Sequence, residues 1–199
     1  MNLGSDEQRQ KKGIAIFASG TGTNAENCIR YFHDHPQAEI RLIVSNKKEA
    51  GVLEIAQRYH IPSLVFLKSD WQQPEIIVRQ LRDHHIDLIV LAGFLALVPP
   101  LIIRTYPHRI INIHPALLPK FGGKGMFGQH VHQAVIDAAA RETGITIHEV
   151  DEEYDHGKVL FQEVVPVLEE DDAASLEKKV RALEYQHLPR VVEKLLLNM

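Results

Sequence analysis

Apolar residues gather in short runs along the first half of the chain, and the segments between these runs carry helical patterning. The strand-like runs are residues 13–19, 40–44, 63–67, 87–93 and 109–114. The segments predicted as helices are residues 23–32, 50–59, 71–84 and 99–106. Strands that alternate with helices in this way favour a parallel sheet with right-handed crossovers.

The second half of the chain follows a different pattern. A helix at 130–140 precedes two strand-like runs, 145–150 and 159–167, which flank the acidic turn 151–157. This order predicts an antiparallel hairpin, followed by a long helix at 174–197. Because the earlier strands are apolar almost throughout, helices should cover both faces of the sheet. The predicted fold is α/β: a Rossmann-like, mostly parallel sheet with helices on both faces and an antiparallel C-terminal hairpin.

Composition and charge narrow the class of protein. Of the 199 residues, 45% are hydrophobic, and the net charge of -4 argues against a nucleic-acid partner. Cys28 is the only cysteine, which excludes an intrachain disulfide and a thiolate zinc cluster. No apolar run reaches the ~18 residues of a membrane span, and the N-terminus lacks a signal-peptide segment. We expect a cytoplasmic protein with no membrane partner, with residues 1–12 as a flexible leader and 13–199 as a single domain.

The first predicted strand ends in the sequence Ser19-Gly-Thr-Gly-Thr-Asn24, which then opens a helix. Glycines allow a close backbone approach, and the free amides at a helix N-terminus bind anions. A dinucleotide site would also need an acidic residue at the end of the second strand, where this chain has Ser45, Asn46 and Lys47. The turn therefore favours a single phosphate, with a dinucleotide or no ligand as the alternatives.

Asn112 and His114 lie at the end of the fifth strand-like run, two residues apart, so their side chains should face the same side. An amide donor and an imidazole in that position can stabilise a developing oxyanion. The alternative is a structural histidine bonded to backbone. A carboxylate would have to orient the histidine, and the turn 151–157 offers four acidic candidates among which spacing does not choose.

The remaining histidines and glycines give weaker signals. Residues 120–128 are rich in glycine and predict a mobile loop near the strand ends. His130 and His132 begin a helix, but a spacing of two does not place them on one helix face. We therefore expect no metal site.

The stretch Asn112-Ile-His-Pro-Ala-Leu-Leu-Pro119 is distinctive and resembles the signature of the folate-dependent formyltransferases. Residues 19–24, Leu91-Ala-Gly-Phe94 and Gly144-Ile-Thr-Ile-His148 are similar to the purine-pathway branch of that family. The resemblance covers nearly the whole chain. It implies transfer of the formyl group of 10-formyltetrahydrofolate to the amine of glycinamide ribonucleotide, with no metal.

The resemblance also implies roles for individual residues. Asn112 and His114 would stabilise the tetrahedral intermediate, and Asp155 would raise the pKa of the histidine and relay protons. The ribonucleotide would bind to Gly22, Thr23, Asn24 and Glu184, in a site based on the N-terminal half. The folate would bind to Leu95, Ala96, Leu97, Val98, Asn112, Asp151 and Asp155, and chiefly to the C-terminal half. His148 matches a cleft histidine of secondary importance.

The chain departs from the family pattern at three places. Leu95-Ala96 replaces a common Met-Arg pair, and Trp71-Gln-Gln-Pro74 lacks a common arginine. The loop 121–128 is longer than usual. The arginine contacts to folate are therefore not implied here.

Other functions remain open from the sequence. Methionyl-tRNA formyltransferase shares the central motif but carries a further domain and needs a basic surface. A formyltetrahydrofolate hydrolase usually carries an N-terminal regulatory domain. A binding module with an inactive site is the non-enzyme alternative, and the joint presence of Asn112, His114 and Asp155 argues against it. Both a monomer and a homodimer fit the sequence.

Overall fold

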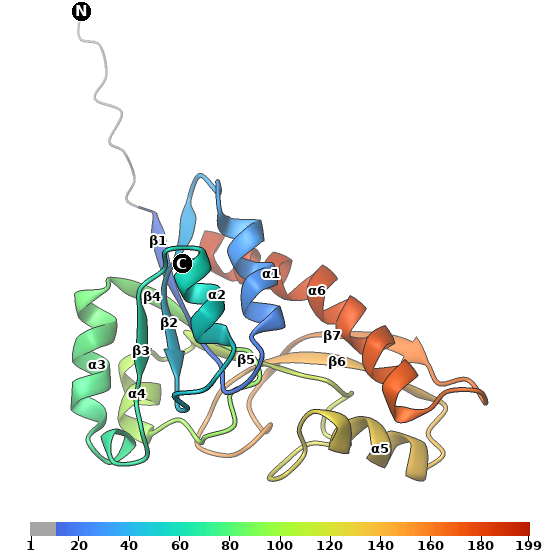
Figure 1. The fold of residues 1–199 in the computed structure, drawn as a ribbon. Coiled ribbons are helices and arrows are strands. Elements are labelled where there is room, and N and C mark those ends of the chain that lie inside the picture. The colour runs from blue at the N-terminus through green and yellow to red at the C-terminus, as the bar shows by residue number, and fades with distance from the viewer. Residues whose placement is uncertain (1–10) are drawn as a thin grey trace, which may run out of the picture.

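The computed structural model describes residues 11–199, so most of the expected leader lies outside the described residues. Within this range, seven strands form one sheet in the order β3-β2-β1-β4-β5-β6-β7 (Figure 1). The strands are β1 Lys12–Phe17, β2 Ala38–Ser45, β3 Ser63–Val65, β4 Ile86–Leu91, β5 Ile110–His114, β6 Glu142–Glu149 and β7 Val159–Pro166. The helices are α1 Thr23–Phe32, α2 Val52–Arg58, α3 Pro74–Asp83, α4 Pro100–Thr105, α5 Gln129–Asp137 and α6 Ala173–Leu197, with a 3-10 turn at Asp70–Gln72. The predicted α/β fold is confirmed.

The strand order identifies the edge of the sheet at which ligands are expected to bind. β1 pairs in parallel with β2 on one side and with β4 on the other. The chain therefore adds β2 and β3 on one side of β1 and then crosses to the other side to form β4. β5 pairs in parallel with β4 but antiparallel with β6, and β6 and β7 form the expected hairpin. In open α/β sheets, ligands bind beyond the carboxyl ends of the strands at such a reversal point. The segments after β1, β4 and β5 all begin there.

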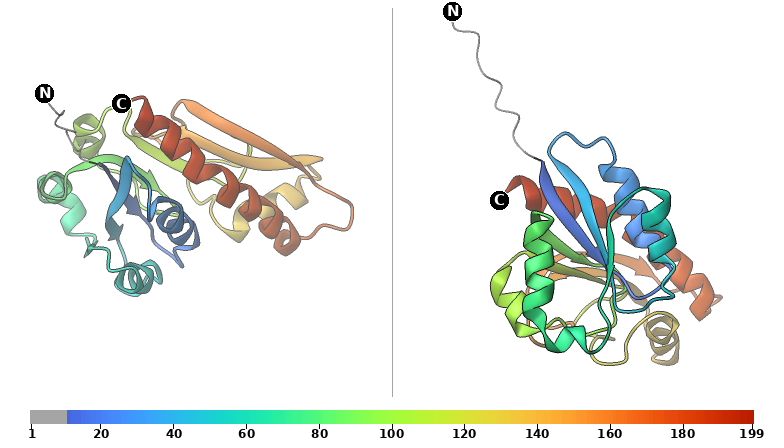
Figure 2. Two further views of the ribbon diagram at one scale, coloured as in Figure 1. Left: turned by 90° about the horizontal axis from the view of Figure 1, so that it is seen from above. Right: turned by 60° about the vertical axis from the view of Figure 1, so that its left-hand side comes forward.

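Both faces of the central strands are buried, as the apolar runs predicted. In β1, Ile14 and Ile16 pack into the core beneath α1, α2 and α6, whereas Ala15 and Phe17 pack towards α3 and α4. Figure 2 shows these helices on opposite sides of the sheet. Cys28 lies inside the first of these cores, and its burial raises the pKa of its thiol to about 12. Cys28 is therefore a packing residue.

The long helix α6 is capped at its start and hydrogen-bonded to α1 near its middle. Asp172 accepts a hydrogen bond from the backbone of Ser175, whose hydroxyl accepts one from the backbone of Asp172. Pro189 lies inside the helix and has no N–H to donate to the carbonyl of Tyr185. The side chain of Asn27, on α1, donates to that carbonyl at 2.8 Å. This contact helps to hold α6 beside the start of α1, at the carboxyl edge of the sheet.

Candidate active site

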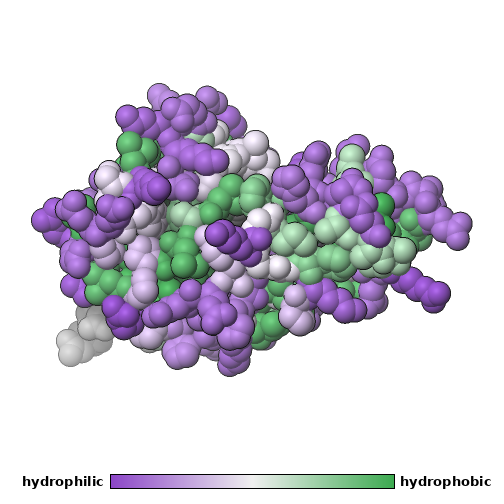
Figure 3. Space-filling model, turned by 90° about the horizontal axis from the view of Figure 1, so that it is seen from below, coloured by the Kyte–Doolittle hydropathy of each residue, from purple (hydrophilic) through white to green (hydrophobic). Residues whose placement is uncertain are grey.

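A cavity of about 560 Å³ opens at the carboxyl edge of the sheet. Its walls come from the turn after β1, the ends of β4 and β5, the loop 123–128, α5 and α6. Figure 3 looks at the molecule from that side and shows hydrophobic side chains in the middle of a mainly hydrophilic face. The cavity therefore combines residues that lie far apart along the chain.

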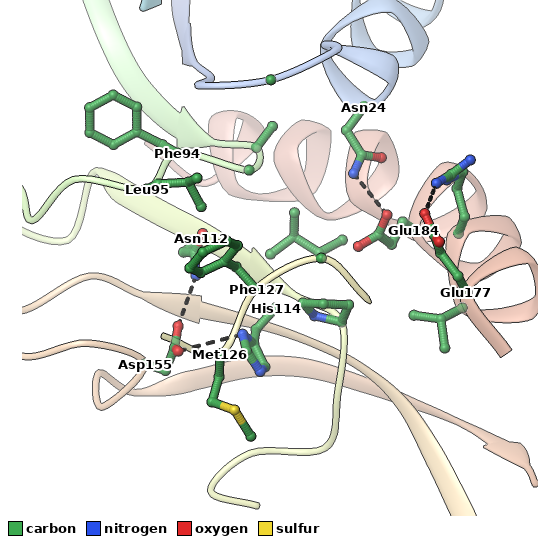
Figure 4. Close-up of a pocket in the computed structure, with 18 of the residues that line it drawn as sticks. Asn24, Phe94, Leu95, Asn112, His114, Met126, Phe127, Asp155, Glu177 and Glu184 are labelled. Atoms are coloured by element: carbon green, nitrogen blue, oxygen red, sulfur yellow. Dashed lines mark hydrogen bonds and ion pairs between the residues drawn. The ribbon is translucent and has the colours of Figure 1, made fainter. Parts of the chain in front are cut away.

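Asn112 and His114 both line this cavity, as the strand spacing predicted. His114 is 3% exposed. Its Nε2 donates to the carbonyl oxygen of Phe121 at 2.8 Å, since a carbonyl can only accept. Its Nδ1 lies 3.5 Å from Oδ2 of Asp155. The imidazole is thus held between the glycine-rich loop and a carboxylate (Figure 4).

Asp155 is the acidic residue of the turn 151–157 that reaches the cavity. Its backbone is left-handed, with φ at 55°, and its side chain points towards Asn112 and His114 (Figure 4). Oδ1 accepts a hydrogen bond from the amide of Asn112 at 3.2 Å, and Oδ2 accepts one from the backbone of Gly123 at 2.9 Å. Asp151, by contrast, accepts hydrogen bonds from within its own turn, and it is not among the lining residues.

His148 fixes the amide of Asn112. Its Nδ1 lies 2.8 Å from the carbonyl oxygen of Glu149 and must donate to it. Nε2 is then the unprotonated nitrogen of the neutral ring and accepts from Nδ2 of Asn112 at 3.0 Å. Because Asn112 also donates to Asp155, both of its amide hydrogens are directed at acceptors. The buried histidine that the resemblance placed in the cleft therefore orients Asn112 from behind.

Burial has the largest effect on the pKa of His114. Removal from water lowers the pKa of the imidazole, while the negative charge of Asp155 acts in the opposite direction. The resemblance implied that Asp155 raises the pKa of His114. The charge of Asp155 does act in that direction, but burial has the larger effect, so the pKa is lowered. Burial alone would raise the pKa of Asp155, yet the contact with His148, the charge of His114 and the Gly123 amide together lower it. Asp155 is therefore held ionised.

The other end of the cavity is formed by the start of α1. Gly22, Thr23 and Asn24 line it, and no side chain caps the first turn of the helix. Gly22 has a φ of 79°, and a Cβ there would lie 2.7 Å from the side chain of Val52. Nδ2 of Asn24 donates to Glu184 on α6 at 2.9 Å. The structure thus brings the expected phosphate-binding turn and Glu184 together.

The expected folate-binding residues are divided between the cavity and its surroundings. Leu95 lines the cavity, whereas Ala96, Leu97 and Val98 are not among the lining residues. Val98 is buried and Leu97 is 43% exposed. Leu95, Phe127 and Tyr154 are large hydrophobic residues that line the cavity and remain partly exposed. An apolar opening suited to an aromatic ring system follows from these three side chains.

Sequence reasoning missed several residues that line the cavity. The glycine-rich loop contributes Lys124 and Met126, and the α5–α6 side contributes His132, Glu177 and Arg181. The spacing of Glu177, Arg181 and Glu184, four and then three residues apart, places all of them on one face of α6. That spacing was readable from the sequence. Nothing in the sequence marked this face as the one towards the cavity.

Within residues 11–199, no group of three or more histidine, cysteine or acidic residues is arranged to hold a metal ion. None of the helices in this range is long and apolar enough to cross a membrane.

The chain is similar to known proteins over most of its length. Residues 12–192 match the family model described as formyl transferase. A chloroplastic phosphoribosylglycinamide formyltransferase of Arabidopsis thaliana is 42% identical over 95% of this chain and 67% of that protein. The Bacillus subtilis phosphoribosylglycinamide formyltransferase is 36% identical over 93% of this chain and 95% of that protein. A crystal structure of the phosphoribosylglycinamide formyltransferase from Bacillus halodurans, 39% identical, covers 93% of this chain and 95% of its own, with a TM-score of 0.83.

The signature at residues 112–119, the fold and these comparisons agree with one another. The chain therefore belongs to the formyl transferase family, and the three relatives described above are named phosphoribosylglycinamide formyltransferases.

Proposed function

We propose that this chain transfers the formyl group of 10-formyltetrahydrofolate to the amine of glycinamide ribonucleotide, in purine biosynthesis, at the Asn112, His114 and Asp155 site. The observation that carries the proposal is the position of this trio in one cavity with the start of α1. A phosphorylated amine bound at α1 can extend its amine towards Asn112. A formyl donor that enters past Leu95 can present its carbonyl at the same point.

The amine attacks the formyl carbon and forms a tetrahedral intermediate with a negatively charged oxygen. Asn112 and His114 are the donors that can stabilise this oxyanion. In the structure, the amide hydrogens of Asn112 are directed at His148 and Asp155, and Nε2 of His114 donates to Phe121. One of these N–H groups must turn from its present acceptor to the oxyanion during the reaction. His148 then keeps the amide of Asn112 in place while its other hydrogen is used.

Asp155 is suited to the proton transfers. The attacking amine must lose a proton, and the departing folate nitrogen must gain one. Asp155 is ionised and lies 3.5 Å from Nδ1 of His114, so a proton taken up by the carboxylate can pass to the imidazole or back to the leaving nitrogen. The lowered pKa of His114 keeps its ring neutral and ready to accept.

An absorbance assay for the loss of 10-formyltetrahydrofolate, with and without glycinamide ribonucleotide, tests this function. The proposal expects loss of the formyl donor only when the amine is present. Turnover without the amine would indicate the hydrolase, and no turnover in either case would indicate a binding module. Formylation of initiator methionyl-tRNA in a parallel reaction would indicate the tRNA-dependent relative.

Two further expectations stay predictions. A cytoplasmic location is one, and the Arabidopsis relative is named as chloroplastic. The choice between a monomer and a homodimer is the other. Both can be measured without the assay, by fractionation of cells and by sedimentation.

A further inference from the structure

Three polar residues lie side by side across the last strands of the sheet. His114 on β5 is directly opposite Thr146 on β6, and Thr146 is directly opposite Gln162 on β7. Residues in such a row point to the same face of a sheet, and the neighbouring row, with Ile113 and Ile147, packs into the core beneath α6. Thr146 and Gln162 are not among the residues that line the cavity. Any part that they play in the reaction must therefore act through other residues.

Thr146 binds the segment that follows β5 through its hydroxyl group. The residue is fully buried. Its Oγ1 donates to the carbonyl oxygen of Ala116 at 2.7 Å and accepts from the backbone amide of Leu118 at 3.0 Å. A hydroxyl has one hydrogen to donate and two lone pairs that accept. One acceptor position of Thr146 is therefore left for a third partner.

Gln162 is this third partner. Its Nε2 donates to Oγ1 of Thr146 at 2.9 Å and to the carbonyl oxygen of Leu118 at 3.0 Å. Because a carbonyl only accepts, the nitrogen end of the Gln162 amide must face this pair. Both amide hydrogens and every hydrogen-bonding position of the Thr146 hydroxyl are thus used. We call these bonds to residues 116–118 the Gln162 clamp, and Gln162 itself is an exposed residue of the edge strand.

Leu118 connects the Gln162 clamp to the proposed catalytic groups. A Cβ at Gly122 would overlap the side chain of Leu118 and lie 3.3 Å from Cβ of Asp155, so the backbone at Gly122 fits between these two residues. The carbonyl of Phe121 accepts from Nε2 of His114, and the amide that follows Gly122 donates to Asp155. Phe121 has a left-handed φ of 56°, which a residue with a side chain keeps only where its surroundings hold it. The position of Leu118 therefore affects the partners of both catalytic side chains.

We propose that Gln162 is a positioning residue for formyl transfer. Together with Thr146, its amide fixes the turn 116–123, and this turn supplies the hydrogen-bond partners that hold His114 and Asp155 in place. The assignment rests on the proposed function for the reaction itself. The placement of His114, however, can be measured without turnover.

The Gln162→Glu variant is the most direct test, because glutamate has the same shape but its ionised carboxylate has no hydrogen to donate. We expect kcat to fall by about 10-fold or more, since two hydrogen bonds are lost. The KM for the ribonucleotide should stay within about twofold, because the variant leaves the start of α1 unchanged. The absorbance assay, with each substrate varied in turn, gives both constants.

Val164→Thr is the matched control for this variant. Val164 is exposed and lies two residues along β7, on the same face of the strand as Gln162. Both kinetic constants should keep their original values in Val164→Thr. An unchanged kcat in Gln162→Glu would overturn the proposal, and so would a kcat that falls equally in the control.

Variants of Thr146 test whether the two residues act as one unit. Thr146→Val keeps the shape but removes the hydroxyl, so kcat should fall at least as far as in Gln162→Glu. Thr146→Ser restores the hydroxyl and should keep kcat within about threefold of the original value. The double variant Gln162→Glu with Thr146→Val should lose little more than Thr146→Val alone, because both changes break the same clamp. Losses that multiply would show independent roles and contradict the proposal.

The ring of His114 reports its own placement in the absence of substrate. Its Nε2–H group, bonded to Phe121, gives a proton–nitrogen NMR signal that should shift or broaden in Gln162→Glu and stay unchanged in Val164→Thr. A lower kcat with an unchanged His114 signal would overturn the proposed route. If the signal shifts but the original chain transfers no formyl group, the proposed function fails while the Gln162 clamp stands. If the original chain transfers formyl and Gln162→Glu changes neither readout, the clamp fails while the function stands.

Discussion

Asp155 and Glu184 are both partly buried carboxylates that line the cavity, and their environments differ. Asp155 accepts hydrogen bonds from Asn112 and Gly123 and lies within 3.6 Å of the rings of His114 and His148, so its pKa is lowered. Glu184 accepts one hydrogen bond, from Asn24. Burial raises the pKa of Glu184, although Asn24 and the charge of Arg181 oppose this.

The difference between the two carboxylates matches the chemistry of each end of the cavity. The reaction end needs a negative charge that can take a proton, and four neighbours keep Asp155 ionised. In the proposed function, the α1 end of the cavity accepts a phosphate, and a carboxylate that resists ionisation repels that anion less. The same kind of side chain therefore has opposite pKa shifts at the two ends of the cavity, and the number of nearby hydrogen-bond donors and charges decides the direction.

Replacement of His114 by alanine should have the largest effect, because it removes a donor to the oxyanion and the partner of Asp155. We expect kcat to fall by about 10²–10³, with ribonucleotide binding still measurable at the other end. The absorbance assay and calorimetry give the two readouts. The exposed His130→Ala variant is the control and should keep the original rate. Original rates in His114→Ala would contradict the catalytic assignment.

The Asp155→Asn variant tests whether the charge at the reaction end matters for the histidine. Its turnover should fall by roughly 10² or more, since general acid–base transfer is lost. Burial lowers the pKa of His114 in the original chain, and this pKa should fall further in the variant, because Asp155 favours the charged ring. NMR titration of the imidazole in both proteins is the measurement. A pKa that rises, or stays the same, would show that Asp155 does not act on His114 electrostatically.

The smallest predicted effects are on stability and have opposite signs at the two ends. The raised pKa of Glu184 means that its ionisation destabilises the folded state as pH rises above about 4.5. Glu184→Gln keeps an acceptor for Asn24 and should raise the unfolding temperature at pH 7 by about 2 °C, with no gain below pH 4.

Asp155→Asn should behave in the opposite way. The lowered pKa of Asp155 stabilises the fold above the ordinary value of 3.8, and this contribution is lost as pH falls through the folded-state value. The variant should therefore unfold at a lower temperature at pH 7 by about 2 °C or more, and the deficit should shrink in acid. Thermal scans from pH 3 to 8 compare both variants. Shifts of the same sign would remove the distinction between the two carboxylates.

The sequence predicted the secondary structure well because the signals are local. The apolar runs and helical spacings gave strands and helices whose ends differ from the observed ones by a few residues. For example, the helix predicted at 71–84 begins at Pro74, after a 3-10 turn at Asp70–Gln72. Proline at the first helical position sets that start. The ends of helices depend on residues that are close in the sequence, so they can be predicted without knowledge of the fold.

The choice of acidic residue in the turn 151–157 could not be made from spacing. Asp151 and Asp155 are both plausible from the sequence, and only the resemblance favoured Asp155 for catalysis. In the structure, the carboxylate of Asp151 accepts hydrogen bonds from Glu153 and His156 within its own turn. The left-handed backbone at Asp155 turns its carboxylate to the cavity. This outcome depends on how the hairpin packs against the loop at Gly123.

His132 shows the same limit on the opposite wall. The spacing to His130 argued against a metal pair, and no local signal indicated a cavity residue. Its position follows from the packing of α5 against α6, which buries the ring among groups more than 40 residues away.

The sequence by itself determined the α/β order, the glycine turn that opens α1 at Gly22, and the placement of Asn112 and His114 on one side of a strand. Each follows from a period or a motif a few residues long. Only the tertiary structure decided in which direction the pKa of each carboxylate shifts, which acceptors the amide hydrogens of Asn112 meet, and which face of α6 meets the cavity. Those properties depend on burial and on donors from distant segments, and the chain brings these together only when the sheet is assembled.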